Sequence, residues 1–218
     1  MKKFLLFMLV PLVALTLAGC QKKVEIKDAL SEVTKVYYQT SNEELSASIC
    51  VGDREERYAV DGKHGKTCEF TLISIKFNDQ QNVNSMGLDF MIDGVETKVV
   101  LELNPANHMY MADLGYALKD DSEISLAYNG KTLTFENVSK NFSIDYNKAI
   151  SIALENFGDE LKPFYNGGSF EGECYLKVLT LRDNGKEDLF WIFTIVGKDK
   201  QTKNIVLNVN DGNIIIKN

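Results

Sequence analysis

The sequence predicts an α+β protein, and three stretches of the chain support this fold class. Apolar residues recur at helical spacing over 26–39, alternate with polar ones through much of 44–135, and return to helical spacing before a set of strands over 141–218. We expect a leading helix with an antiparallel β-rich domain, built as a sheet or a sandwich, and then a small domain with one helix on an antiparallel sheet. The predicted segments are a signal peptide (1–19), a tether (20–25), the β-rich domain (26–140) and the small domain (141–218).

The first twenty residues have the three-part form of a secretory signal. Two lysines precede an apolar run, Phe4–Leu17, and small residues then lead to Cys20. Leu17-Ala18-Gly19-Cys20 resembles the lipobox of bacterial lipoproteins, which implies cleavage before Cys20 and a diacylglycerol on its sulfur. The alternatives are a secreted product without lipid, for which cleavage before a cysteine is unusual, and a transmembrane anchor. The fourteen residues of the apolar run fall short of the about 20 that a spanning helix needs.

Bulk composition limits the possible partners. Loss of two lysines with the signal peptide takes the formal net charge from −7 to −9. This acidic balance argues against nucleic acid, whose binding requires clustered cations. The chain has 21 lysines, 3 arginines and 18 asparagines, a bias typical of AT-rich genomes such as those of low-GC Gram-positive bacteria. We therefore expect a protein held by lipid on the extracytoplasmic face of the cell membrane.

Residues 26–39 are predicted to form an amphipathic helix. Ile26, Ala29, Leu30 and Val33 recur at helical spacing, with charged residues between them. The run from Val33 to Tyr38 is rich in β-branched and aromatic residues, which also suit a strand.

The next stretch, from Glu44 to about Phe135, alternates with a period of two. Asp93-Gly94 and Asn129-Gly130 each separate two alternating runs, which is the strongest short-range signal of a β-hairpin because a type I′ turn requires positive φ. The polar turns recur at a spacing typical of all-β modules.

From about residue 143 the pattern predicts a helix followed by strands. Ser143 or Asp145 can cap a helix with an apolar stripe, which Gly158 would end. Strands are expected at about 173–181, 188–197 and 204–210, with a short Ile214–Ile216 tail. The middle strand is apolar on both faces, so we expect it to be central in its sheet and covered by the helix.

This helix and its strands resemble a PepSY or PepSY-like domain. The resemblance is carried by Ala149–Ala153, Leu189–Phe193 and Ile205–Ile214 and covers about a third of the chain. In that family a helix packs on a small antiparallel sheet, and the domains are mostly extracytoplasmic, non-catalytic modules proposed to modulate peptidases or bind partners near the envelope. The resemblance implies no catalytic residues, and it implies an envelope protein or a peptidase as partner.

Three cysteines remain when Cys20 carries lipid. Cys50 and Cys68 flank a turn-rich segment, and they either bridge two neighbouring strands or are ordinary buried side chains. Cys174 opens a strand and is expected in the core. No pair of cysteines has CxxC spacing and the histidines lie far apart, so no zinc site is predicted.

No motif in the sequence specifies a reaction. His64 and His108 fall in turn-rich stretches, where a solvated loop residue is expected, and neither a GxSxG elbow nor a phosphate-binding glycine loop is present. Arg54 and Arg57 are expected to pair with neighbouring glutamates across a hairpin rather than to bind a ligand carboxylate. We therefore predict no catalytic residue, metal or cofactor.

These observations predict a lipid-anchored binding or modulatory module at the cell envelope. Phe164, Tyr165 and Phe170, in the loop 163–172, are the candidate residues for an exposed partner-binding patch. The alternative is a hydrolase with a carboxylate-based site in the β-rich half, which would require a concave cleft on which two buried carboxylates converge.

Overall fold

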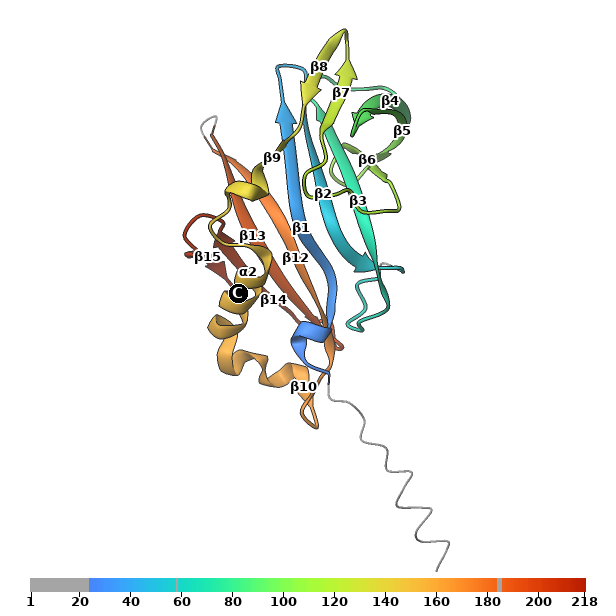
Figure 1. The fold of residues 1–218 in the computed structure, drawn as a ribbon. Coiled ribbons are helices and arrows are strands. Elements are labelled where there is room, and N and C mark those ends of the chain that lie inside the picture. The colour runs from blue at the N-terminus through green and yellow to red at the C-terminus, as the bar shows by residue number, and fades with distance from the viewer. Residues whose placement is uncertain (1–23, 58, 184–185) are drawn as a thin grey trace, which may run out of the picture.

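One long β-sheet runs through the described part of the chain, and the α-helix Tyr146–Phe157 lies against it (Figure 1). The computed structural model describes residues 24–57, 59–183 and 186–218. The strand order in the sheet is β15-β14-β13-β12-β1-β2-β3-β6-β5-β4-β7-β8, and β9 pairs with β1. The strands are β1 (Leu30–Ser41), β2 (Leu45–Glu55), β3 (Thr67–Phe77), β4 (Ser85–Ile92), β5 (Val95–Asn104), β6 (Met109–Asp113), β7 (Ile124–Tyr128), β8 (Lys131–Thr134), β9 (Glu136–Asn137), β12 (Gly172–Asp183), β13 (Lys186–Gly197), β14 (Thr202–Asn208) and β15 (Ile214–Lys217).

The remaining elements are short, apart from the helix. The hairpin β10 (Tyr165–Asn166) and β11 (Ser169–Phe170) forms its own small sheet. The helices are α2 (Tyr146–Phe157) and the 3₁₀ turns η1 (Ile26–Asp28), η2 (Val138–Asn141) and η3 (Gly158–Phe164).

The predicted N-terminal helix over 26–39 is wrong. Only η1 is helical, and the chain then continues as the twelve-residue strand β1. The β-branched and aromatic run from Val33 to Tyr38 prefers a pleated surface, and β1 has strand partners on both edges. On one edge β1 pairs with β2, and on the other it pairs with β12 at its start and with β9 near its end.

The predicted α+β class, with a separate antiparallel sheet in each half, is also wrong. β1 pairs in parallel with β12, with Leu30 opposite Cys174 and Val33 opposite Leu176, and this pairing joins both halves into one mixed sheet. The protein is mostly β, with one α-helix among the described residues. Sequence periodicity reports which residues share a face, but it does not report which distant strand lies alongside. The domain boundary at 140/141 stays a prediction.

Several local predictions are confirmed. Asp93-Gly94 joins β4 to β5 and Asn129-Gly130 joins β7 to β8, and all four turn residues have positive φ. The backbone N–H of Lys148 donates to the carboxylate of Asp145 at 2.8 Å, which caps α2 as expected. The four C-terminal strands form an antiparallel meander with β13 inside it.

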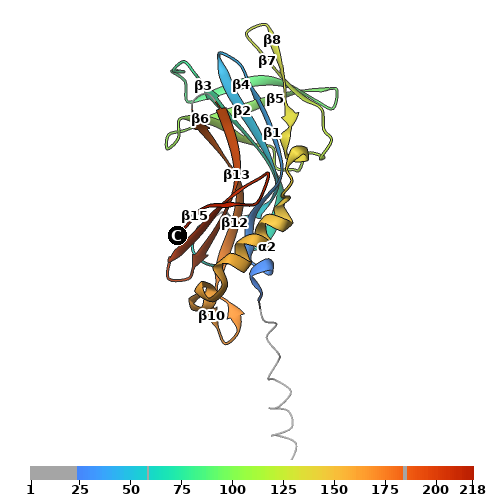
Figure 2. The same ribbon diagram turned by 90° about the vertical axis from the view of Figure 1, so that its left-hand side faces the viewer.

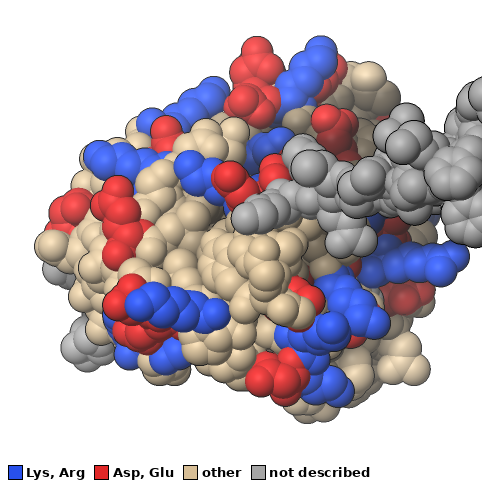
Figure 3. All heavy atoms as spheres, turned by 90° about the horizontal axis from the view of Figure 1, so that it is seen from below, with Lys and Arg blue, Asp and Glu red and all other residues tan. Residues whose placement is uncertain are grey.

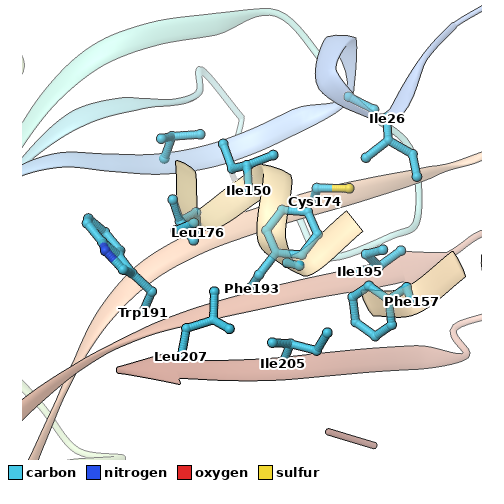
Figure 4. Close-up of a cluster of buried hydrophobic side chains, with 14 of the residues drawn as sticks. Ile26, Ile150, Phe157, Cys174, Leu176, Trp191, Phe193, Ile195, Ile205 and Leu207 are labelled. Atoms are coloured by element: carbon cyan, nitrogen blue, oxygen red, sulfur yellow. The ribbon is translucent and has the colours of Figure 1, made fainter. Parts of the chain in front are cut away.

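Two hydrophobic cores lie along this sheet. In the first, which we call the helix-covered core, α2 packs on β12–β14, and Figure 4 shows Phe193 and Ile195 of the sheet beside Ile150 and Phe157 of the helix. The indole N–H of Trp191 donates to the carbonyl of Ile144 at 2.7 Å, which ties the segment before α2 to the sheet.

In the second core, which we call the curled core, the sheet bends over itself (Figure 2). β4, β5, β7 and β8 curl back, and β9 then pairs with β1. The enclosed side chains include Ile49, Ile73, Phe90, Leu101 and Leu126, each at most 1% exposed.

A β-bulge in β1 lies where the two cores meet. Val33 stands opposite Asp53 and Val36 opposite Val51, so the four residues 33–36 of β1 face the three residues 51–53 of β2, and both valines remain on one face. Val33 belongs to the helix-covered core and Val36 to the curled core. The bulge brings the β1 backbone so close to Gly52 that a Cβ there would lie 1.8 Å from the Val33 carbonyl oxygen.

Candidate functional site

The described chain begins at one end of the molecule, beside the β10–β11 hairpin (Figure 1). The Val24 N–H donates to Ser169 Oγ at 3.2 Å, and the Val24 carbonyl accepts from the Phe170 N–H at 2.9 Å. These bonds hold the start of the described chain against β11. The predicted lipidation site, Cys20, lies outside the described residues.

The three aromatic residues predicted as a partner-binding patch do come together at this end. The ring centroids of Phe164 and Phe170 lie 6.4 Å apart, and those of Tyr165 and Phe170 lie 5.7 Å apart. Phe164 and Phe170 are only 2% and 4% exposed and belong to the helix-covered core, whereas Tyr165 is 39% exposed. The expectation that all three are exposed is therefore wrong, because the loop folds its two phenylalanines inward and leaves only Tyr165 at the surface.

Two open hollows flank this end. One, of about 280 Å³, lies beside η3 and the β13–β14 turn. The other, of about 250 Å³, lies between η1, the start of β1 and the start of α2. The first is lined by Pro163, Glu171, Lys198, Asp199 and Gln201, and the second by Lys27, Asp28, Leu30, Val33, Lys35, Asp53, His64, Thr67, Tyr146, Asn147 and Ile150.

The second hollow contains charges that neutralise one another. Lys35 and Asp53 form an ion pair at 2.6 Å. Although desolvation opposes it, the bond to Asp53 leaves the pKa of Lys35 raised above its ordinary value, so this ammonium stays charged. The hollow therefore offers no strong field of one sign to a charged ligand.

A buried carboxylate beside this hollow holds the loop between β2 and β3. Glu55 is 5% exposed, and its Oε1 accepts from the hydroxyl of Ser31 and from the N–H of Gly65, both at 2.6 Å. His64 Nδ1 lies 3.5 Å from the same oxygen and 3.4 Å from Ser31 Oγ. Because one oxygen gathers all three groups, Glu55 fixes the loop end at residues 64–65.

This cluster has the residue types of a nucleophilic triad but not the geometry. In a triad the histidine lies between the hydroxyl and the carboxylate and takes the hydroxyl proton. Here the Ser31 proton goes directly to Glu55, and Ser31 is only 1% exposed, so no substrate can reach its oxygen. The arrangement binds the loop and does not activate a nucleophile.

A second buried carboxylate holds the same loop from the other half of the chain. Glu173, on β12, is completely buried, and its Oε1 accepts from the Gly62 N–H at 2.8 Å. Gly62 has φ +79, and a Cβ there would lie 2.4 Å from the Gly197 carbonyl oxygen. We call this set the loop clasp: Ser31, Glu55, Gly62, Gly65 and Glu173, with the loop 56–66 joined to both halves of the sheet.

Glu173 also has an unsatisfied atom. Its Oε2 is buried and has no hydrogen-bond partner among the described residues. Neither Glu173 nor Glu55 lines either of the two hollows.

The sequence did not predict the loop clasp, since Glu55 was expected to form an ion pair with an arginine across a hairpin. A usable signal was present for Glu55, which shares strand parity with Leu45, Ala47, Ile49 and Val51 and so faces inward. Glu173 had no such signal, since its burial depends on a loop more than a hundred residues away in sequence.

The cysteines do not form the bridge considered for Cys50 and Cys68. Both are free thiols on neighbouring strands, but Cys50 stands opposite Leu72 while Cys68 stands opposite Arg54. A four-residue offset corresponds to about 13 Å along a strand, which is beyond disulfide reach. Desolvation, with a smaller contribution from Glu32, raises the pKa of the Cys50 thiol to about 12. Burial also raises the pKa of Cys174, which lies in the helix-covered core as expected.

The prediction that Arg54 pairs with a neighbouring glutamate is wrong. Arg54 pairs with Asp113 on β6, and its guanidinium lies 5.3 Å from the centre of the Phe70 ring. Glu56 pairs instead with Lys66. His108 occupies the turn before β6 with φ 55. Arg54 therefore has a structural partner in Asp113.

No cluster of three or more histidine, cysteine, aspartate or glutamate side chains in the described ranges could hold a metal ion. None of the helices in that part of the chain has the length and apolar character needed to cross a bilayer.

Comparisons of the whole chain with protein-family models, with curated proteins and with solved structures found no match. The lipobox and the PepSY-like domain therefore stay predictions that rest on the residues quoted for them.

Proposed function

We propose that this protein is a lipid-anchored, extracytoplasmic binding or modulatory module of the cell envelope. The observation that carries the proposal is the run Leu17-Ala18-Gly19-Cys20 after a basic and then apolar start. Two acyl chains on Cys20 would provide stable anchoring, since each buried methylene contributes roughly 0.8 kcal/mol.

The roles of the reactive side chains support binding rather than bond-making. Ser31, Glu55 and Glu173 hold the loop 56–66, and Lys35 and Asp53 neutralise each other. A carboxylate-based hydrolase would place two buried carboxylates on one cleft, and Glu55 and Glu173 line neither of the two hollows. The partner that we propose is an envelope protein, with a peptidase as the specific candidate from the PepSY-like resemblance.

Metabolic labelling tests the anchor. Cells that express the full chain are fed radiolabelled palmitate, and a Cys20→Ser variant is the matched control. We expect label on the wild-type chain only, and we expect the variant to keep its signal peptide and migrate more slowly. Absence of label from the wild type, with identical maturation of the two proteins, would refute the anchor.

Crosslinking in intact cells tests the binding role. We expect the wild-type protein to be crosslinked to a defined envelope protein, such as a peptidase. The same envelope protein should not be recovered with the Cys20→Ser variant. Recovery of only abundant bystanders would contradict the proposal.

A further inference from the structure

The end of the molecule that carries Val24 has features that match the surface of a bilayer. Three residues separate Cys20 from Val24, so a fully extended tether spans at most about 14 Å. Val24 is itself hydrogen-bonded to β11, so the tether ends at Val24 and cannot be longer than this. If Cys20 is in the membrane, the β10–β11 hairpin is within one tether length of it.

The exposed aromatic residue at this end has the chemistry of the membrane interface. Tyr165 is 39% exposed, while its ring packs edge-on against the buried Phe170. Tyrosine is enriched at membrane–water interfaces, where its ring contacts acyl chains and its hydroxyl stays hydrated.

The charged residues at this end include two pairs of opposite sign. Lys162 lies 3.0 Å from Asp159, and Lys198 lies 3.7 Å from Glu171. Seen from below, basic side chains (Lys or Arg) and carboxylates are interspersed around an uncharged area (Figure 3). Such a surface is not repelled by anionic headgroups and does not depend on them.

We propose that the end formed by η1, η3 and the β10–β11 hairpin rests on the outer surface of the bilayer, with the Tyr165 ring in its interfacial layer. This inference rests on the proposed lipid anchor at Cys20 and adds the orientation of the folded part. The twelve residues of β1 rise from this end over about 40 Å. The hairpin β7–β8, joined by the ion pair of Lys131 and Glu44 to the turn between β1 and β2, therefore points away from the membrane.

Fluorescence quenching by brominated lipid tests the orientation, because bromine in the acyl chains quenches only nearby indoles. The single native tryptophan, Trp191, is 1% exposed and hydrogen-bonded in the core, so it supplies a constant background. Tyr165→Trp adds a probe at the proposed contact. Thr132→Trp is the matched control, since Thr132 is exposed on the edge strand β8 at the far end.

The lipidated full-length protein is reconstituted in vesicles of phosphatidylcholine and phosphatidylglycerol, with and without brominated acyl chains. We expect Tyr165→Trp to lose much of its added emission in brominated vesicles and to show a blue-shifted maximum, whereas Thr132→Trp shows neither change. Circular dichroism checks that both variants keep the wild-type fold.

Three outcomes would overturn the orientation while leaving the anchor intact, provided that the protein still floats with the vesicles. The first is no quenching at Tyr165→Trp, and the second is equal quenching in the two variants. The third is that envelope extract, but not vesicles, shields Tyr165→Trp from quenching by acrylamide. This third outcome would assign the surface to a protein partner. Failure of the wild-type protein to take up palmitate would instead contradict the proposed function.

Discussion

The two cores share one face of one sheet, yet they are closed by different means. α2 covers the first, and the curling hairpins β4–β5 and β7–β8 cover the second. The helix-covered core contains the aromatic pair Phe157 and Phe193, contributed by the two layers. The curled core depends on side chains from one sheet meeting each other after a bend. The difference shows that an amphipathic sheet face does not determine what covers it. In one core the covering layer is α2, which precedes β12–β14 in the chain, and in the other it is the pair of hairpins that follow β1–β3.

The largest expected effect tests whether the two cores unfold together. Phe193→Ala empties the helix-covered core and Phe90→Ala the curled core, and each should lower the free energy of unfolding by about 3–5 kcal/mol. Because β1 belongs to both cores, we expect Trp191 fluorescence and far-UV circular dichroism to shift together in denaturant for either variant. If Phe90→Ala shifts only the circular dichroism and leaves the Trp191 transition in place, the cores are independent units.

The bulge between the cores gives the next largest effect. Gly52→Ala places a methyl group 1.8 Å from the Val33 carbonyl oxygen, a backbone atom that cannot turn aside. We expect a loss of about 1–3 kcal/mol or more from overpacking, read from chemical denaturation. Gly65→Ala is the matched control, since its nearest contact is an ordinary 3.4 Å to the Glu55 side chain. Equal losses of unfolding free energy in the two variants would show that the bulge has no special role.

The loop clasp is expected to link the two halves of the chain. Glu55→Ala leaves the hydroxyl of Ser31 and the N–H of Gly65 without their acceptor, which should cost about 1–3 kcal/mol. Glu55→Gln keeps one oxygen acceptor and should lose less. Limited proteolysis within the loop 56–66 should accelerate in the alanine variant. Unchanged cleavage there would show that the loop is held by other contacts.

The smallest expected effect concerns a surface carboxylate, Glu160 in η3. Hydrogen bonds from Lys217 and then Lys203 lower the pKa of Glu160 from its ordinary 4.5 to about 2. A depressed folded-state pKa means that the stabilisation is present above pH about 4.5 and is lost as the pH falls toward 2. Glu160→Gln should therefore lower the Tm slightly at pH 7, and the gap from wild type should close between those two pH values. A gap that is constant with pH would contradict this cause.

The sequence predicted the elements whose signals are local. The turns Asp93-Gly94 and Asn129-Gly130 and the apolar central strand β13 depend on residues close to one another in the chain. The same holds for the cap of α2, which was predicted at Ser143 or Asp145 and is Asp145. The prediction failed for 26–39, where helical spacing and β-branched residues coexist. The segment forms a strand and not a helix because β2, β9 and β12 pair with it. The residue pattern of 26–39 does not indicate any of these partner strands.

The candidate site was predicted only in part, for a related reason. Tyr165 is exposed as expected, but Phe164 and Phe170 fill the core, because an aromatic loop residue can fold inward as readily as outward. The loop clasp joins Gly62 to Glu173 across 111 residues, and no short-range pattern encodes such a contact.

The parallel pairing of β1 with β12 has a consequence for the order in which the chain can fold. Tyr37 and Thr180, whose hydroxyls lie 3.1 Å apart, are separated by 143 residues, so the chain must close a very long loop before β1 is paired on both edges. While synthesis is still delivering the last third of the chain, the edge of β1 that β12 later covers is open, on a strand that contains Val33, Val36, Tyr37 and Tyr38. That nascent intermediate, rather than the finished protein, is the species most exposed to aggregation.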